Sequence, residues 1–355
     1  MPRFINLRKY AGHTLRLLLS AALVWNLAAC AAQAPEQTGN STDTRTEAST
    51  QENPFAAVPG DGEIVAFAYA FGLESPKYTD TMVYDGTPLQ VTYYINSDGA
   101  AMSVGVLMFV NGVPQPYSVD GGETDSYMYI QPVEADAYVA VQAQFVPVCG
   151  SAGETVSIRF LCILNPQLRP DALNYVYGHT NSMTTFHSRD IIMEVDATEQ
   201  ASGYPQLEMP REMTQEEIDQ VIYTDGSGNS VNKLDWFHFV ARNAEDSSLV
   251  SLPVEDHCIR FQLQSYGGSD AAYMVIPYIN QVPMLSGSYP CLLNMKSGTY
   301  IFSRLMALDL SELDPDVYQL QSYNTLYLLA IPLNGGSALQ PVITQSFVFC
   351  WEDAE

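Results

Sequence analysis

Short segments in which apolar and polar residues alternate recur along most of this chain. In Leu89–Asn96, the apolar residues Leu89, Val91, Tyr93 and Ile95 alternate with polar neighbours. A period of two residues is typical of a β-strand that buries one face. Helical periodicity is almost absent, so the sequence predicts an all-β fold.

Turn signals separate these predicted strands. Val104–Val110 is apolar on both faces, as in a central strand, and Asn111-Gly112 after it is a strong signal for a two-residue hairpin. Tyr138–Val146 and Thr155–Leu164 are predicted to form a second hairpin around residues 150–153. Flanking strands are expected at Glu63–Phe71 and Ile191–Val195.

The second half of the chain repeats the first in outline. Val91-x-Tyr93-x-Ile95 corresponds to Ile259-x-Phe261-x-Leu263. The motif Asn111-Gly112-Val113-Pro114 begins 20 residues after Val91, and the similar motif Asn280-Gln281-Val282-Pro283 begins 21 residues after Ile259. Phe160–Pro166 likewise corresponds to Leu326–Pro332. Such self-similarity predicts tandem copies of one fold. The pattern resembles the tandem immunoglobulin-like modules of bacterial surface lipoproteins, although the Cys–Trp–Cys arrangement of true immunoglobulin domains is missing.

These observations divide the chain into segments. We expect two immunoglobulin-like β-sandwich domains, at residues 61–198 and 234–355, joined by a connector at 199–233. The connector is predicted to hold one short helix at 214–223, because Thr214 and Glu217 have the spacing of a capping box.

The N-terminal residues have the layout of a secretory signal. Residues 1–29 contain no acid, and a basic stretch is followed by the apolar run Leu17–Ala29. That run is shorter than the roughly 20 residues of a membrane-spanning helix, which is the alternative interpretation. Leu27-Ala28-Ala29-Cys30 resembles the lipobox of bacterial lipoproteins. The resemblance implies that residues 1–29 are removed and that a diacylglyceryl group on Cys30 holds the protein in the bilayer, on the extracytoplasmic side of a bacterial membrane.

Composition after the signal predicts a tether and excludes one class of partner. Residues 30–60, after the lipidated cysteine, are rich in Ala, Gln, Thr, Ser, Glu and Pro, so they are predicted to be a disordered tether. The whole chain has 15 bases and 40 acids, and the signal holds 4 of the bases, so the mature charge is 11 − 40 = −29. This charge argues against binding to nucleic acid.

Five cysteines remain in the mature chain beside Cys30. They are Cys149, Cys162, Cys258, Cys291 and Cys350. The odd number leaves at least one thiol unpaired, and no zinc-site spacing is present. We expect mostly reduced, structural cysteines, with one disulfide as the alternative.

Three groups of residues are candidates for chemistry. His179 and His187 lie in the polar segment 178–190. Within it, Ser182, His187 and Asp190 could form a hydrolytic set. No Gly-x-Ser-x-Gly elbow supports that set, and a polar loop is the alternative. Acidic clusters at 120–125, 225–229 and 309–316 make Ca²⁺ an alternative partner, although none has the full calcium-loop pattern. No cofactor or resident metal is predicted.

Tyrosine is the third group, with 22 residues in the chain. Tyrosine offers rigid contact area at low entropic cost, so Tyr94, Tyr117, Tyr127 and Tyr129, together with His179 and His187, are the predicted binding residues. The alternative is simple β-propensity.

We therefore expect a non-enzymatic, membrane-anchored lipoprotein that presents its sandwiches to a surface protein or glycan. A carbohydrate-binding lipoprotein and a cell-wall or glycan hydrolase remain alternatives.

Overall fold

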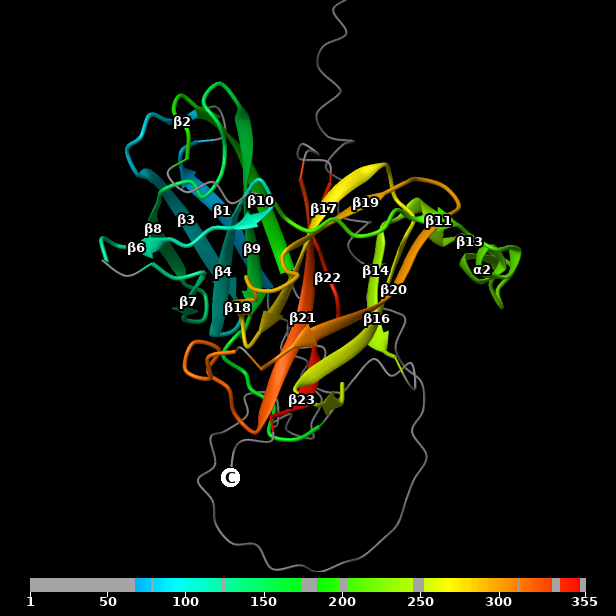
Figure 1. The fold of residues 1–355 in the computed structure, drawn as a ribbon. Coiled ribbons are helices and arrows are strands. Elements are labelled where there is room, and N and C mark those ends of the chain that lie inside the picture. The colour runs from blue at the N-terminus through cyan, green and yellow to red at the C-terminus, as the bar shows by residue number, and fades with distance from the viewer. Residues whose placement is uncertain are drawn as a thin grey trace, which may run out of the picture. The chain divides into compact units, whose positions relative to one another are not determined.

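A computed structural model describes residues 68–77, 80–122, 125–173, 184–197, 203–244, 252–311, 313–333 and 339–351, with the backbone alone described at 184–187. From Glu63 onward the chain forms one compact unit. Nearly all of its regular structure is β, as the sequence predicts (Figure 1).

Two sheets make up the first repeat. Across the first sheet the strands are β1 (Ala68–Ser75), β3 (Leu89–Asp98), β8 (Tyr138–Phe145) and β6 (Ser118–Val119). Across the second sheet they are β2 (Met82–Tyr84), β10 (Thr184–Met193), β9 (Thr155–Leu164), β4 (Met102–Val110) and β5 (Val113–Pro114), with β7 (Met128–Val133) also paired to β4.

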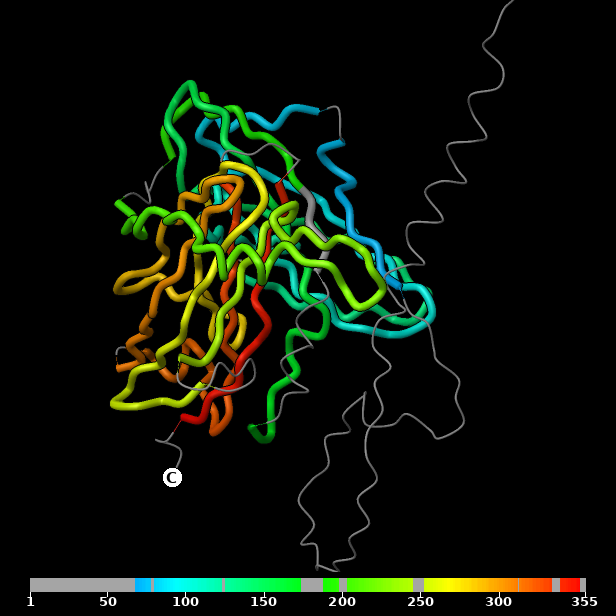
Figure 2. Tube along the Cα trace, turned by 90° about the vertical axis from the view of Figure 1, so that its right-hand side faces the viewer, coloured from blue at the N-terminus to red at the C-terminus, as the bar shows by residue number. Residues whose placement is uncertain are grey.

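The second repeat also has two sheets. The third sheet contains β18 (Val282–Pro283), β17 (Ala271–Ile279), β21 (Tyr323–Pro332) and β22 (Val342–Ile343), with β19 (Cys291–Met295) paired to β17 and β23 (Phe347–Cys350) paired to β21. The fourth sheet contains β11 (Arg211–Glu212), β20 (Tyr300–Asp309), β16 (Cys258–Tyr266) and β14 (His238–Asn243), with β15 (Val254–Glu255) paired to β16. Figure 2 follows the same chain as a tube, with this repeat in yellow-green to red.

The strand order is the same in the two repeats. The order β1-β3-β8 in the first sheet matches β14-β16-β20 in the fourth, and β9-β4-β7 in the second matches β21-β17-β19 in the third. Each pair of sheets divides consecutive strands in the manner of an immunoglobulin-like sandwich. The similar motifs lie on equivalent strands, because Val91 and Ile259 belong to β3 and β16. The predicted fold of two tandem immunoglobulin-like sandwiches is confirmed.

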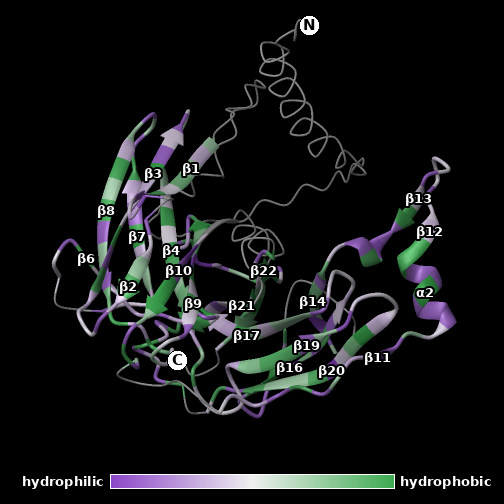
Figure 3. Ribbon diagram, turned by 90° about the horizontal axis from the view of Figure 1, so that it is seen from above, coloured by the Kyte–Doolittle hydropathy of each residue, from purple (hydrophilic) through white to green (hydrophobic). Residues whose placement is uncertain are grey.

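The central strands of the second and third sheets, β4 and β9 and β17 and β21, are buried on both faces. Along β17, Tyr273 and Val275 belong to the core of the second repeat, whereas Met274, Ile276 and Tyr278 belong to a buried cluster that also contains the core of the first repeat. Residues of opposite parity on one strand point to opposite faces. The four sheets are therefore stacked, with the second packed on the third, and this explains why Val104–Val110 is apolar at every position. Figure 3 shows β1, β3 and β8 in one layer and β4, β9 and β10 in the next.

Side chains of both repeats hydrogen-bond across this junction. Arg159 Nη1 donates to the Leu339 carbonyl at 2.9 Å, and Gln281 Nε2 donates to the Pro166 carbonyl at 3.3 Å. Arg159 is almost fully buried. Burial therefore lowers the pKa of its guanidinium, an effect that nearby Asp190 opposes.

The hairpin turn of the first repeat also lies at the junction. Gly112 has φ +83°, and a Cβ there would overlap Leu333 Cδ2 and lie 3.3 Å from Met274 Cβ. Gly112→Ala is expected to lower the free energy of unfolding by about 2–3 kcal/mol, because it combines backbone strain with overpacking. Gly228→Ala is the matched control, since φ is +84° there but a Cβ meets open space; it should cost about 1 kcal/mol. Urea denaturation of both variants checks this, and equal losses would contradict the packing argument.

The connector contains the one α-helix of the described residues, α2 (Gln215–Val221). Thr214 is its N-cap and forms the predicted capping box with Glu217, whose carboxylate also bonds Arg211 at 2.6 Å. That bond to Arg211, aided by the Thr214 backbone, lowers the pKa of Glu217 to about 2. The helix ends two residues earlier than predicted. Its C-cap residue begins β12 (Ile222–Thr224), which pairs with β13 (Ser230–Asn232) ahead of the short 3-10 helix η2 (Lys233–Asp235). Among the described residues, no helix has the length and apolarity to cross a membrane.

Candidate functional site

Two tyrosines lie together on the outer face of the first sheet. Tyr94 of β3 and Tyr138 of β8 are diagonal neighbours, because Asn96 is the register partner of Tyr138. Their ring centroids are 5.4 Å apart with an interplanar angle of 21°, so the rings are stacked. Tyr138 is 52% exposed. Tyr94 was predicted as a binding residue, and Tyr138 was missed, although alternation within Tyr138–Val146 assigns it to the polar face.

The neighbouring edge strand holds both rings in place. Gly72 of β1 is the register partner of Tyr94, and a Cβ at Gly72 would lie 2.6 Å from the Tyr94 hydroxyl oxygen. The absence of a side chain therefore lets the Tyr94 ring lie against the sheet. The hydroxyl of Tyr138 donates to the Glu74 carboxylate on the same edge strand. This hydrogen bond fixes the direction of the Tyr138 ring.

Apart from Glu74, the outward side chains next to this pair carry no charge. We call this surface the tyrosine face. It consists of Gly72 of β1, Gln90, Thr92, Tyr94 and Asn96 of β3, and Tyr138, Ala140, Gln142 and Gln144 of β8. Gln142 Nε2 donates to Gln90 Oε1 at 3.4 Å across the two strands. Three acids border the face: Glu74, whose carboxylate accepts the Tyr138 hydroxyl, Asp120, whose Oδ1 accepts the Gln142 backbone N–H, and Asp98 at the far end of β3. The face can therefore make stacking contacts and neutral hydrogen bonds.

Tyr117 and Tyr129 lie elsewhere. Tyr117 is fully buried, and its hydroxyl donates to the Val106 carbonyl at 2.6 Å. Its ring centroid is 5.0 Å from that of half-buried Tyr129. Burial raises the pKa of both hydroxyls, well above the usual value for Tyr117. Tyr117 is thus a core residue that presents no surface to a partner.

Tyr127 lines a separate hollow at the junction of the repeats. This pocket has a volume of about 300 Å³ and also contains Met128, Arg169, Val317 and Gln319 in its lining. The Arg169 guanidinium donates to the carbonyls of Pro166 at 3.1 Å and Asn280 at 3.3 Å. Its half-burial lowers its pKa. The structure therefore separates Tyr127 from Tyr94 rather than gathering the four predicted tyrosines at one site.

The histidine segment differs from the predicted loop. His179 and Ser182 lie outside the described residues. His187 lies within β10, where its register partner is Phe160, and the structure describes only its backbone. Strand β10 begins at Thr184, earlier than the predicted Ile191, because it pairs along β9. The binding roles of His179 and His187 and the hydrolytic set stay predictions.

The acidic clusters are engaged in turns. Asp225 Oδ1 accepts the backbone N–H groups of Ser227 at 2.9 Å and Asn229 at 2.8 Å, which lowers its pKa together with the side chain of Asn229. Asp309 Oδ1 accepts both the backbone N–H of Ser311 at 2.9 Å and its hydroxyl at 2.6 Å. Within the described part of the chain, no group of three or more His, Cys, Asp or Glu residues is placed to hold a metal ion. Glu123 and Glu312 lie outside that part.

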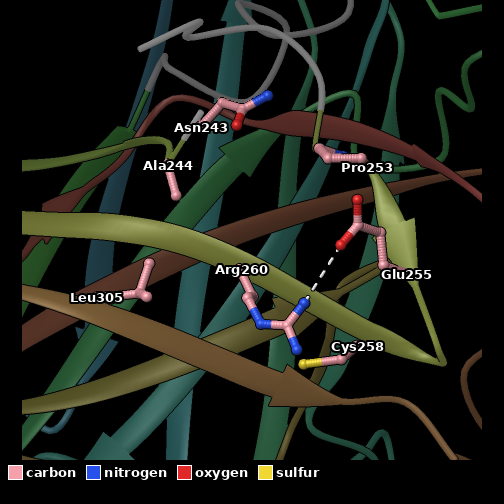
Figure 4. A pocket seen from close by; sticks show the side chains of 7 residues that line it. All are labelled: Asn243, Ala244, Pro253, Glu255, Cys258, Arg260 and Leu305. Atoms are coloured by element: carbon pink, nitrogen blue, oxygen red, sulfur yellow. Dashed lines mark hydrogen bonds and ion pairs between the residues drawn. The ribbon is translucent and has the colours of Figure 1, made fainter. Parts of the chain in front are cut away.

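A smaller hollow borders Cys258 on the fourth sheet (Figure 4). Its volume is about 140 Å³, and its lining includes Glu255, Arg260 and Leu305. Arg260 Nη1 lies 3.3 Å from Glu255 Oε2, and both side chains are about half exposed. Ligand pockets are usually larger than this. The ion pair also neutralises the charges that could recognise a ligand, so this hollow is the weaker candidate.

None of the five cysteines in the described part of the chain forms a disulfide in the structure. Cys149, Cys162 and Cys291 are buried, and burial raises the pKa of Cys149 to about 11 and of Cys291 to about 12. Because the thiolate is the reactive form, we expect a maleimide to label only half-buried Cys258 and Cys350 in native protein. Mass spectrometry of peptides checks this. Native labelling of Cys291 at the rate of Cys258 would contradict the burial.

Comparison with known proteins assigns this chain to no family. No family model matches the chain, and no curated protein matches it. Among solved structures, the Salmonella enterica SafA pilin in complex with the SafB chaperone is 11% identical, with a TM-score of 0.22, over 81% of this chain and 97% of that chain. The CsuC–CsuE chaperone–tip adhesion subunit complex of Acinetobacter baumannii is 10% identical, with a TM-score of 0.17, over 74% and 94%. The secreted serine protease VesC of Vibrio cholerae is 9% identical, with a TM-score of 0.20, over 81% and 52%. Likenesses this distant carry no argument about what the chain does.

Proposed function

We propose that this chain is an extracytoplasmic lipoprotein, anchored to a bacterial membrane through a diacylglyceryl group on Cys30, that binds a surface protein or glycan without catalysing a reaction. The motif Leu27-Ala28-Ala29-Cys30 after an acid-free, basic and apolar segment supports the anchor. Two acyl chains on one residue are enough for stable membrane attachment. The charge of −29 on the mature chain would keep the folded part away from anionic headgroups.

The observation that carries the binding role is the tyrosine face. Tyr94 and Tyr138 form a stacked pair on an outer sheet face, and hydrogen bonding to Glu74 holds Tyr138 in one direction. Rigid aromatic side chains with adaptable amide neighbours are typical of recognition surfaces. The uncharged amides and hydroxyls around the pair specifically favour the second candidate function, a carbohydrate-binding lipoprotein.

Binding of the protein to isolated cell envelopes tests this function. The mature chain with Cys30→Ala, which removes the anchor, is incubated with cell envelopes of the host and sedimented. We expect saturable retention that Tyr138→Ala abolishes and Tyr223→Ala preserves, because Tyr223 is an exposed tyrosine of the β12–β13 hairpin, far along the chain. Equal retention of the Tyr138→Ala and Tyr223→Ala forms would contradict a binding role for this surface.

A further inference from the structure

The centre of the tyrosine face lacks charge although the chain carries 40 acids. Outward positions of β3 from Gln90 to Asn96 and of β8 from Tyr138 to Gln144 are Gln, Thr, Tyr, Asn or Ala. The charges at its border are carboxylates, because Glu74 accepts the Tyr138 hydroxyl and Asp120 accepts the Gln142 backbone N–H. The outward positions of β3 and β8 hold no base that could pair with an anionic partner. The uncharged centre and its acidic border therefore favour a neutral partner over an anionic one.

From this chemistry we infer that the tyrosine face is a binding surface for an uncharged glycan chain, with a sugar ring stacked on Tyr138. The inference rests on the proposed binding function and names its ligand class. Sugar rings carry an apolar face of C–H groups and an edge of hydroxyl groups. The first fits an aromatic ring, and the second needs neutral donors and acceptors together.

The aromatic pair meets the first requirement. Tyr138 is 52% exposed, and its ring is held from below by Tyr94 stacking and at its hydroxyl by Glu74. A ring that is already fixed loses little conformational entropy when a ligand binds. Gly72 lies beneath the Tyr94 ring, and Ala140, the other register partner of Tyr94, adds only a methyl group beside the pair.

The surrounding amides meet the second requirement. Gln90, Asn96, Gln142 and Gln144 each present both a carbonyl acceptor and an N–H₂ donor. Sugar hydroxyls donate and accept in the same way, so each can pair without an unsatisfied group. The Gln142–Gln90 bond of 3.4 Å is long and easily exchanged for a bond to a ligand.

The outer face of the fourth sheet shows that neutrality is not general in this protein. Its strands present Arg242, Arg260 and Asp309 to the outside. The equivalent strands of the first sheet carry two outward acids, Glu74 of β1 and Asp98 at the end of β3, and no outward base. A protein partner would instead favour a more apolar centre than two rings among amides.

Titration calorimetry tests the inference on the full mature chain, purified in a detergent without a sugar headgroup. The probes are cellohexaose, xylohexaose, mannohexaose and N-acetylchitohexaose, with hyaluronan and polygalacturonate as charged glycans. We expect binding of at least one neutral probe and of neither charged one. Raising NaCl from about 50 to about 500 mM should change that affinity less than about twofold, since no charges pair across the contact.

Variants separate the tyrosine face from the rest of the molecule. Tyr138→Ala should lower the affinity at least about tenfold, which is about 1.4 kcal/mol. Gly72→Ala, whose Cβ would displace the Tyr94 ring, should also weaken it, and Tyr223→Ala should leave it unchanged. Unchanged thermal unfolding of the exposed-site variants shows that they fold.

Three results would overturn the inference. These are no binding of any neutral probe, binding of the charged probes alone, or full affinity in Tyr138→Ala. If no glycan binds while envelope capture still depends on Tyr138, only the glycan assignment fails and the partner is a protein. If envelope capture is also independent of Tyr138, the proposed function fails with it.

Discussion

Replacement of Tyr327 by alanine is expected to lower the free energy of unfolding by about 4–5 kcal/mol and to weaken both repeats together. Tyr327 is fully buried on β21, on the side of the third sheet that faces the second. Its ring is stacked on Tyr278 with centroids 5.3 Å apart, and its hydroxyl donates to Gln281 Oε1 at 2.7 Å. Alanine would remove a whole buried ring and leave the Gln281 oxygen without this donor.

The shared cluster is the reason that both repeats should respond. Tyr327, Leu329 and Ile331 belong to the same buried cluster as Val106 and Phe160 of the first repeat. Hydrogen exchange measured on peptides from β3 and β16 checks this, and both should exchange faster in the variant. Tyr327→Phe keeps the ring and should cost only about 1–2 kcal/mol. Faster exchange in β16 alone would show that the repeats unfold independently and would contradict a common core.

The second large effect concerns Cys30, which lies outside the described residues. Cys30→Ala is expected to move the protein from the membrane pellet to the soluble fraction after ultracentrifugation. In the proposed lipoprotein the acyl chains would supply the attachment, at about 0.8 kcal/mol for each buried CH₂ group. A chain of charge −29 has no electrostatic attraction to anionic lipid that could retain it once the lipid is lost.

A matched cysteine variant controls this prediction. Cys258→Ala removes a half-exposed thiol of the folded part and should leave the protein in the pellet. If the Cys30→Ala protein sediments with the membrane as well, the apolar run Leu17–Ala29 is acting as the anchor, and the lipoprotein assignment is wrong.

Local patterns predicted the elements that depend on neighbours in sequence. The alternation in Leu89–Asn96 became β3, and the capping box of Thr214 became the N-terminus of α2. The apolar run Val104–Val110 was correctly read as a central strand. Its second covering layer comes from β17 and β21, more than 160 residues away along the chain, and no local pattern specifies that partner.

The candidate site was only partly accessible to sequence reasoning. Alternation alone assigns Tyr94 to the outer face of β3. The burial of Tyr117 depends on its hydrogen bond to Val106 and its contact with Tyr129, which are tertiary. The pairing of Tyr138 with Asn96 sets the aromatic pair, and it depends on the β3–β8 register between strands 40 residues apart.

Capture of membranes on neutral glycan tests the central claim most directly, because it requires the anchor and the tyrosine face at once. Membranes from cells that produce the full chain are passed over beads coated with the neutral glycan bound in solution. We predict that wild-type and Tyr223→Ala membranes are retained, and that Cys30→Ala and Tyr138→Ala membranes pass through. Retention of Tyr138→Ala membranes at the wild-type level would contradict the account.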